Sequence, residues 1–165
     1  MMRSLFRLAA DRSGSSAAEM ALATPLLMVL MFGAFELGHF FLSEHVVQKA
    51  VRDAARYAAR LPMSSYPACT PTAAALTQIQ RVARTGQPDG TIQRLQGWSA
   101  DAMTTVTVTC DTSGTYTGLF VDNPQGVPVV TVAASVPYPS LFGTLGIGEP
   151  SLTLNARSQT AAFGA

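Results

Sequence analysis

Few side chains in this sequence of 165 residues could carry out chemistry. The two histidines, His39 and His45, have no serine or cysteine nearby in a recognisable nucleophile motif, and the sequence contains no HExxH, GxSxG or GxxxxGKS/T pattern. No pair of acids stands out for general acid–base work in a predicted cleft. We therefore expect a protein that is not an enzyme and uses no cofactor.

The two cysteines, Cys69 and Cys110, are the other reactive side chains. They form no CxxC pair and no cluster with histidine, so no metal site is expected. In an exported domain they could form a disulfide that closes a loop of about 40 residues and contributes roughly 3–4 kcal/mol. The alternative is two unpaired, buried thiols. The sequence leaves both open, because it does not give the distance between them.

A lone acid, Glu19, stands at the start of the most distinctive stretch. It follows a junction of small residues, 14–18, and precedes residues 20–35, which carry no charge. A carboxylate at the edge of such a run needs a cationic partner, because an unpaired charge in a low dielectric is costly. Cleavage after Gly14 would create that partner as a new amino group on Ser15.

The leader, residues 1–14, carries three arginines and one aspartate, for a net charge of +2. In a secretory signal peptide the small-residue cleavage site follows the apolar run, whereas here the small junction precedes it. Cleavage at this junction would remove the leader on the cytoplasmic side and leave the apolar segment in the protein. We place the amino terminus in the cytoplasm because so short a tail is easily retained there; the distribution of positive charges decides little.

The apolar run is short for a membrane span. A spanning helix needs about 20 residues, so we expect a transmembrane helix over residues 15–42, which takes in Glu36. This acid either lies at the outer headgroup level or has a functional partner. Pro25 removes one backbone donor inside the run. It predicts a kink or local melting, which neighbouring subunits could cover.

The helix is not expected to end at the membrane surface. Residues 43–61 are strong helix formers without glycine or proline, so the whole helix would be roughly 70 Å long, with about 30 Å of it in hydrocarbon. The remainder is amphipathic and must pack on the C-terminal domain or on a neighbour. Its apolar side is predicted at Val46, Ala50, Ala54, Tyr57 and Leu61. A basic arc is predicted at His45, Lys49, Arg52, Arg56 and Arg60. Such an arc is typical of a solvated face; lipid headgroups or an acidic partner surface are the alternatives.

Residues 62–165 are predicted to form an exported α+β domain. A proline-rich break, 62–72, leads into a short helix at about 72–85, with Thr70 as its N-cap, Pro71 at the first position and Gly86 at its end. We expect Trp98 in the core.

From residue 104 the apolar period changes from helical to two. Strands are predicted at 104–110, 127–138 and 151–160, with a further one at 116–121. The fold class is thus α+β, with the long amino-terminal helix packed against a small antiparallel sheet.

The connection at 137–150 is unusually apolar for a loop. It places Leu141, Phe142, Leu145 and Ile147 among three glycines. It is either a buried loop that caps the core or an apolar tip that touches membrane or another subunit.

Charge excludes one class of partner. The formal net charge is +1, which gives no field for nucleic acid, and the charged fraction of 13% is about half that of a typical soluble chain.

Four segments together resemble a known family. They are GSSAAEMALATPLL (Gly14–Leu27), GAFELGHFF (Gly33–Phe41), AVRDAARYAAR (Ala50–Arg60) and VTVAASVPYPSLFGTLGIGEPSLTLNARS (Val130–Ser158). These residues resemble the TadE-like family, minor pseudopilins of the tight-adherence (Flp/Tad) type IV pilus. The sequence departs from the family pattern at His39, where arginine is more frequent, and at Met20, where an aromatic residue is more usual.

The resemblance implies a pilin-like fold and a prepilin peptidase that cuts after Gly14, leaving Ser15 as the amino terminus and Glu19 as mature residue five. It implies a single-pass inner-membrane protein with a cytoplasmic amino terminus and a periplasmic C-terminal domain. The implied partners are the prepilin peptidase, other pilins or pseudopilins, the inner-membrane pilus assembly machinery and the lipid bilayer. Whether the protein enters the extracellular adhesive pilus is left open.

Two other classes of protein fit parts of the sequence. The first is an uncleaved single-pass membrane protein whose exported domain binds an envelope partner or ligand. The second is a secreted enzyme released by signal peptidase.

Overall fold

A computed structural model describes residues 13–114, 116–121, 123, 125–144 and 152–164. The chain forms two compact units, one ending at Gly38 and the other running from His39 to Ala165. We call the described part of the first unit, residues 13–38, the N-terminal segment, and the second unit the C-terminal domain. Most of the predicted leader lies outside the described residues.

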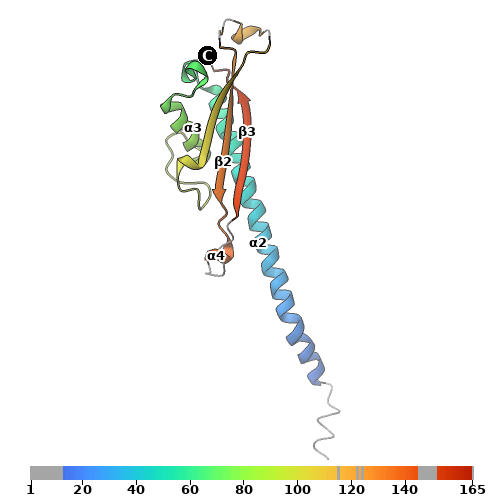
Figure 1. Ribbon diagram of the computed structural model, residues 1–165. Helices are drawn as coiled ribbons and strands as arrows, with labels where there is room; N and C mark the ends of the chain where they lie inside the picture. Colours follow the sequence, from blue (N-terminus) through green and yellow to red (C-terminus); the bar gives the residue numbers. More distant parts are fainter. Residues whose placement is uncertain (1–12, 115, 122, 124, 145–151, 165) are drawn as a thin grey trace, which may run out of the picture. The chain divides into compact units, whose positions relative to one another are not determined.

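Helix α2 (Ser13–Arg60) supplies the whole N-terminal segment and the first element of the C-terminal domain (Figure 1). It runs through Pro25 without a break, so the local melting predicted there is not found. Proline removes only one backbone donor, and the flanking turns keep their own hydrogen bonds. The Thr24 hydroxyl also donates to the Met20 carbonyl at 2.6 Å.

In the C-terminal domain, α2 buries one face against the core. Ala50 and Ala54 are buried as predicted, whereas Val46, Tyr57 and Leu61 are half-buried at its edge. The centre of the face is formed by residues that lie between the predicted ones, namely Val47, Val51, Ala55 and Ala58. Small side chains dominate it, which lets the helix approach the sheet closely. The predicted basic arc is exposed on the other side of the helix.

Helix α3 (Ala73–Thr85) agrees with the predicted short helix except at its start. The N-cap is Thr72, whose side chain accepts a hydrogen bond from the Ala75 amide at 3.3 Å, and not Thr70 as the Thr-Pro pattern predicted. Both Thr70 and Thr72 have a side-chain oxygen that can cap a helix, and the sequence alone does not show which of the two is the N-cap. Gly86 ends the helix in the left-handed conformation at φ 91°, as expected for a C-cap glycine.

Three strands form one antiparallel sheet in the order β1 (Thr104–Asp111), β2 (Val127–Pro137) and β3 (Thr153–Ala161). All three were predicted from the two-residue period. The strand predicted at 116–121 is wrong, because the described residues there include a 3₁₀ turn, Gly118–Phe120. Gly118 has a φ of 69°, which a strand does not allow.

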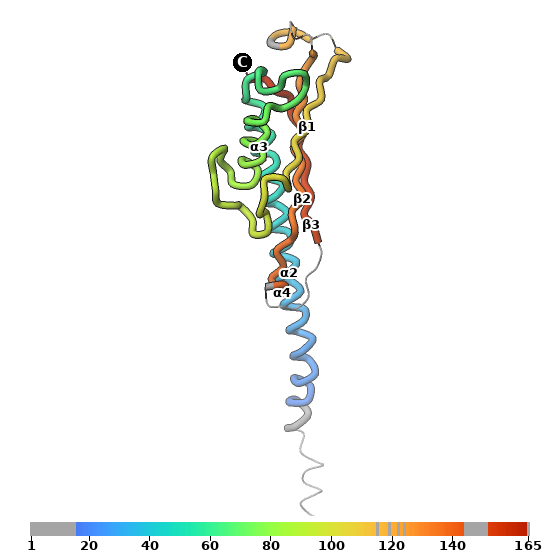
Figure 2. The backbone as a smooth tube through the Cα atoms, turned by 60° about the vertical axis from the view of Figure 1, so that its left-hand side comes forward, coloured from blue at the N-terminus to red at the C-terminus, as the bar shows by residue number. Residues whose placement is uncertain are grey.

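The two faces of the sheet differ in character. Val130, Val132 and Val136 on β2 are fully buried and join the core with α2, α3 and the buried Trp98. The opposite face carries mainly threonine, serine, asparagine and glutamine, and most of it is exposed. Figure 2 shows α2 and α3 on one side of the sheet, so the core lies between the two layers as the α+β prediction required.

Covalent and ionic links fix the connections of the C-terminal domain. A disulfide joins Cys69 to Cys110 and so ties the loop after α2 to the end of β1, with the two Cα atoms 5.7 Å apart. Arg84 Nε lies 2.6 Å from the Asp101 carboxylate, and Arg94 Nη1 lies 2.9 Å from that of Asp53. These pairs hold the irregular segment between α3 and β1 against both helices.

Candidate processing and assembly segment

The predicted cleavage point lies at the very start of α2. The structure describes the backbone of Gly14 and Ser15 as helical, one and two residues after the helix begins at Ser13. The first four amides of a helix have no acceptor within it, so the first turn opens at lower cost than the interior. A peptidase that binds an extended substrate could therefore reach the Gly14–Ser15 bond without unfolding the rest of α2.

Glu19 is an exposed residue of α2, four positions after Ser15. Residues at this spacing lie on the same face of a helix, roughly 5–6 Å apart between their Cβ atoms, and a helical side chain leans toward the amino terminus. An amino group created on Ser15 would thus lie within reach of the Glu19 carboxylate of the same chain.

The helix surface that follows Glu19 is apolar all round and uncovered. The large apolar side chains of this surface are exposed to solvent: Met20, Leu22, Leu26, Leu27, Met28, Val29, Leu30, Met31, Phe32, Phe35 and Leu37. A helix that is apolar on all sides is stable only when lipid or protein covers it. By length and composition α2 is sufficient to cross a membrane, and its most apolar 18-residue window has no buried residue.

Pro25 and Glu36 interrupt this apolar surface in different ways. Pro25 lies within the helix, so the carbonyl four residues before it has no amide donor at that position. Glu36 is half-buried. Both belong to the N-terminal segment, whereas the two cysteines belong to the C-terminal domain.

The predicted exit motif contains a contact that sequence reasoning missed. His39 Nδ1 lies 3.1 Å from the Tyr138 hydroxyl, and the Phe40 ring meets the Tyr138 ring edge-on at a centroid distance of 5.2 Å. These residues are 99 positions apart, so no local pattern could reveal the contact. It joins the start of the C-terminal domain to the residue that follows β2.

Electrostatics in the C-terminal domain serve the fold. The buried Tyr66 hydroxyl donates to the Ala58 carbonyl near the end of α2 at 2.6 Å, and burial, with a smaller effect of Tyr57, raises the pKa of Tyr66 to about 12. Asp111 accepts from the hydroxyl and amide of Ser113, and these hydrogen bonds lower the pKa of its carboxyl. Among the described residues, no group of three or more histidine, cysteine or acidic side chains could hold a metal.

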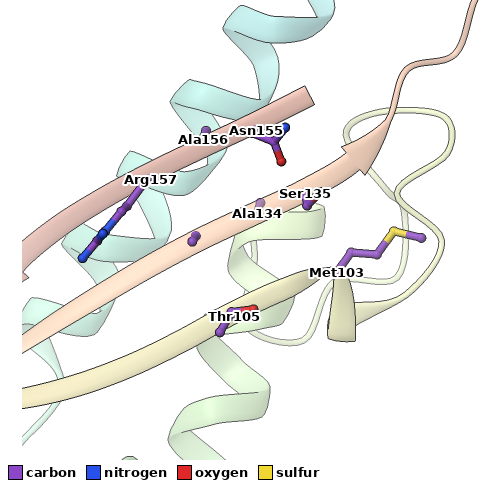
Figure 3. Close-up of a pocket in the computed structure, with 8 residues that line it drawn as sticks. Met103, Thr105, Ala134, Ser135, Asn155, Ala156 and Arg157 are labelled. Atoms are coloured by element: carbon purple, nitrogen blue, oxygen red, sulfur yellow. The ribbon is translucent and has the colours of Figure 1, made fainter. Parts of the chain in front are cut away.

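A shallow groove lies on the exposed face of the sheet (Figure 3). It has a volume of about 340 Å³ and takes side chains from all three strands, among them Thr105, Ser135, Asn155 and Arg157. The residues that line it include no histidine, cysteine or carboxylate. The groove is therefore a polar surface with one positive charge, from Arg157, and its lining residues include no nucleophile paired with a base.

The segment built on α2 is also the part of the chain that is similar to known proteins. Residues 14–56 match the family model of TadE-like protein. The resemblance to the TadE-like family is thereby confirmed over the small-residue junction, the apolar run and the start of the amphipathic continuation. The C-terminal segment that contributed to the resemblance lies outside the match. Comparison with curated proteins and with solved structures gave no match.

The family match and the exposed apolar helix agree with each other. Together they support a Tad pilus-associated component that is anchored in a membrane by an N-terminal apolar helix. Components of this kind are structural rather than enzymatic.

Proposed function

We propose that this TadE-like chain is a minor pseudopilin, a structural or assembly component of a Flp/Tad type IV pilus. The single observation that supports it best is the exposed apolar surface of α2, which starts directly after the small-residue junction and Glu19. A helix of this kind can lie in lipid first and pack against other subunits later, because both environments cover its apolar sides.

In this proposal a prepilin peptidase removes residues 1–14. Residues 15–42 form the transmembrane helix, 43–61 its amphipathic continuation, and 62–165 the exported domain. The amino terminus is cytoplasmic, the protein resides in the inner membrane, and the C-terminal domain is periplasmic. Gly14 suits the cut because the absence of a side chain fits a small recognition site and permits the backbone to unwind.

Glu19 is the proposed assembly residue. In the membrane its carboxylate pairs with the Ser15 amino group of its own chain, since both lie on one helix face. In an assembly the partner is the Ser15 amino group of a neighbour. A charge in low dielectric is costly without a partner, so the pairing fixes the register between subunits. The remaining partners are other pilins or pseudopilins and the inner-membrane assembly machinery.

Cleavage is tested by the mass and the amino-terminal sequence of the membrane-bound protein, isolated from cells that contain the pilus system. We expect loss of residues 1–14 and an amino terminus at Ser15. Gly14→Lys should give a product of full precursor size, because the long side chain cannot enter a small recognition site. Gly14→Ala is the matched control and should still be cut. A shortened product from Gly14→Lys would exclude cleavage at this bond.

Assembly is tested separately with Glu19→Gln, which keeps the size of the side chain and removes its charge. Cleavage should continue, while incorporation into pilus assemblies falls. Glu44→Gln is the control, because it removes a carboxylate from the same helix beyond the apolar run, where the Glu44 carboxylate accepts a hydrogen bond from Gln48 Nε2 at 3.1 Å. Normal assembly of the Glu19→Gln variant would contradict the proposed pairing of the Glu19 carboxylate with the Ser15 amino group.

The alternative is an uncleaved single-pass protein whose exported domain binds an envelope partner or ligand. The groove on the polar face of the sheet, with Arg157 beside Asn155, favours this class because it is open and carries a charge. The intact precursor mass, together with normal pilus assembly after deletion of the gene, would favour it over the pseudopilin.

A further inference from the structure

The connection between β2 and β3 presents apolar side chains to solvent. Leu141, the first residue of α4 (Leu141–Thr144), is 40% exposed, and Leu152 is 51% exposed. Residues 137–144 carry no charged side chain. We call Tyr138–Phe142 together with Leu152 the apolar tip; residues 145–151, which include the predicted apolar residues Leu145 and Ile147, lie outside the described part of the chain.

Specific contacts hold this tip against α2. The buried Tyr138 meets His39 through its hydroxyl and Phe40 through its ring, and its amide donates to the Leu152 carbonyl at 2.9 Å. The buried Ser140 hydroxyl then accepts from the amides of Phe142 and Gly143 at 3.2 and 3.1 Å and so orders the start of α4. The position of the tip along α2 is thus fixed at residues 39–40.

That position is the end of the apolar run. Phe41 and Leu42, which close the run, are themselves 50% and 67% exposed, and the first exposed basic-arc residue, His45, follows within one helical turn. Where α2 crosses a bilayer, these residues mark its outer boundary. Side chains held beside them lie at the same depth.

We propose that the apolar tip is a second membrane contact, in which Leu141 and Leu152 enter the outer interface of the bilayer next to Phe41 and Leu42. Lipid is the occupant because the exposed residues of α2 in the same domain that follow His39 and Phe40, namely Phe41 and Leu42, are apolar, and because the described residues of the tip carry no charge. Tyr138 suits this level, since its apolar ring and polar hydroxyl match the interface. The contact gives the C-terminal domain a second attachment to the membrane, in addition to the spanning helix. This inference rests on the proposed membrane anchoring.

The test uses the full chain reconstituted in vesicles of phosphatidylcholine and phosphatidylglycerol, with and without lipids brominated near the headgroup end of the acyl chains. Leu141→Trp and Leu152→Trp place a reporter on the tip. The native Trp98 is fully buried in the core and gives a constant background. Ile92→Trp is the control in the same domain, at a site that is 84% exposed, and Leu30→Trp reports on the apolar run, with deep-brominated lipid as its quencher.

We expect brominated lipid to remove roughly half of the added fluorescence of Leu141→Trp and of Leu152→Trp, because the indole ring prefers the interface. Ile92→Trp should be unaffected and Leu30→Trp strongly quenched. Quenching of Leu30→Trp without quenching of either tip variant would overturn this inference and leave the anchoring intact. No quenching at Leu30→Trp would instead remove the membrane anchoring on which it rests.

A protein occupant gives a different result. If a second copy of the chain covers the tip, the emission of Leu141→Trp shifts to the blue as the protein-to-lipid ratio rises, without quenching by bromine. That outcome would also overturn the lipid contact. A Leu141→Asp, Leu152→Asp double variant adds an independent check, since it should raise the accessibility of the domain to protease in vesicles, while Ile92→Asp should not.

Discussion

Tyr66 shows how one hydroxyl closes the end of a long helix. Its hydroxyl donates to the Ala58 carbonyl in the last turns of α2. The last carbonyls of a helix have no amide donor within the helix and need partners from outside it. Tyr66→Phe keeps the ring and removes this hydrogen bond, while the Leu61 amide still donates to the Ala58 carbonyl at 3.2 Å. We expect the free energy of unfolding to fall by about 0.5–1.5 kcal/mol, measured by chemical denaturation with Trp98 fluorescence as the probe.

The same residue predicts a dependence on alkaline pH. An unfolded tyrosine ionises near pH 10, whereas burial raises the pKa of Tyr66 in the folded protein to about 12. Between these values the unfolded state has lost a proton that the folded state keeps, so the free energy of unfolding decreases as pH rises. Below the unfolded pKa the contribution is constant. The decrease from Tyr66 should be absent in Tyr66→Phe, and equal slopes of stability against pH in the two proteins would contradict it.

The disulfide is the second feature at the scale of single residues. Cys69 and Cys110 are 41 positions apart, and their link removes freedom from the unfolded chain. We expect a double replacement of both cysteines by serine to lower the free energy of unfolding by roughly 3–4 kcal/mol. Reductant should lower the stability of the natural chain toward that of the variant and leave the variant unchanged. Equal denaturation midpoints for the natural chain with and without reductant would show that the link contributes nothing.

At the scale of elements, α2 joins two different surfaces in one helix. Over residues 20–35 it is apolar on every side, whereas after His39 it has a face rich in alanine toward the sheet and a basic arc toward solvent. The alanines set the distance between helix and sheet. We expect Ala54→Leu, at a fully buried position, to cost about 1–3 kcal/mol by overpacking.

Arg56→Leu is the matched control for that prediction. Arg56 lies two positions away on the exposed arc, so the same leucine should change stability by less than about 0.5 kcal/mol. Thermal unfolding of both variants in one detergent decides the point. If Arg56→Leu destabilises as much as Ala54→Leu, the arc is not a solvated face.

The spacing of apolar residues, together with the residues that favour turns and helix ends, was sufficient to predict the three strands and α3. The strands around Val106, Val132 and Leu154 follow from alternation, and α3 follows from helical spacing before Gly86. The errors have local causes. Gly118 adopts a conformation that no strand permits, and Thr72 competes with Thr70 for the same cap.

Contacts between distant parts of the sequence were beyond prediction. The His39–Tyr138 contact depends on how β2 ends beside α2, and the approach of Cys69 to Cys110 depends on how the loop after α2 packs on β1. Gly14, Glu19 and Glu36 could be selected as candidate site residues from the sequence, because a charge or a small residue next to an apolar run is visible in the local pattern. The sequence did not mark the apolar tip as fixed to α2, since the residues that hold it lie on separate elements.

At the scale of the whole molecule, the chain divides into an N-terminal segment with an exposed apolar surface and a C-terminal domain with its own buried core. Among the described residues, those of the buried core lie between Val47 and Ala162, within the C-terminal domain. We therefore expect a fragment of residues 39–165 to fold by itself, with its free energy of unfolding within about 1 kcal/mol of that of the C-terminal domain in the full chain. Urea denaturation followed by Trp98 fluorescence measures both.

Membrane binding of that fragment is the counterpart of its independent folding. Without residues 1–38 the fragment keeps Phe41, Leu42 and the apolar tip as its proposed lipid contacts, and a contact of that size gives weak, reversible binding compared with a spanning helix. The fragment should therefore stay mostly in the supernatant when vesicles are sedimented, while the full chain is found in the pellet. A fragment that fails to unfold cooperatively would contradict this prediction. The core would then depend on the N-terminal segment, which would contribute to the fold of the domain as well as to its anchoring.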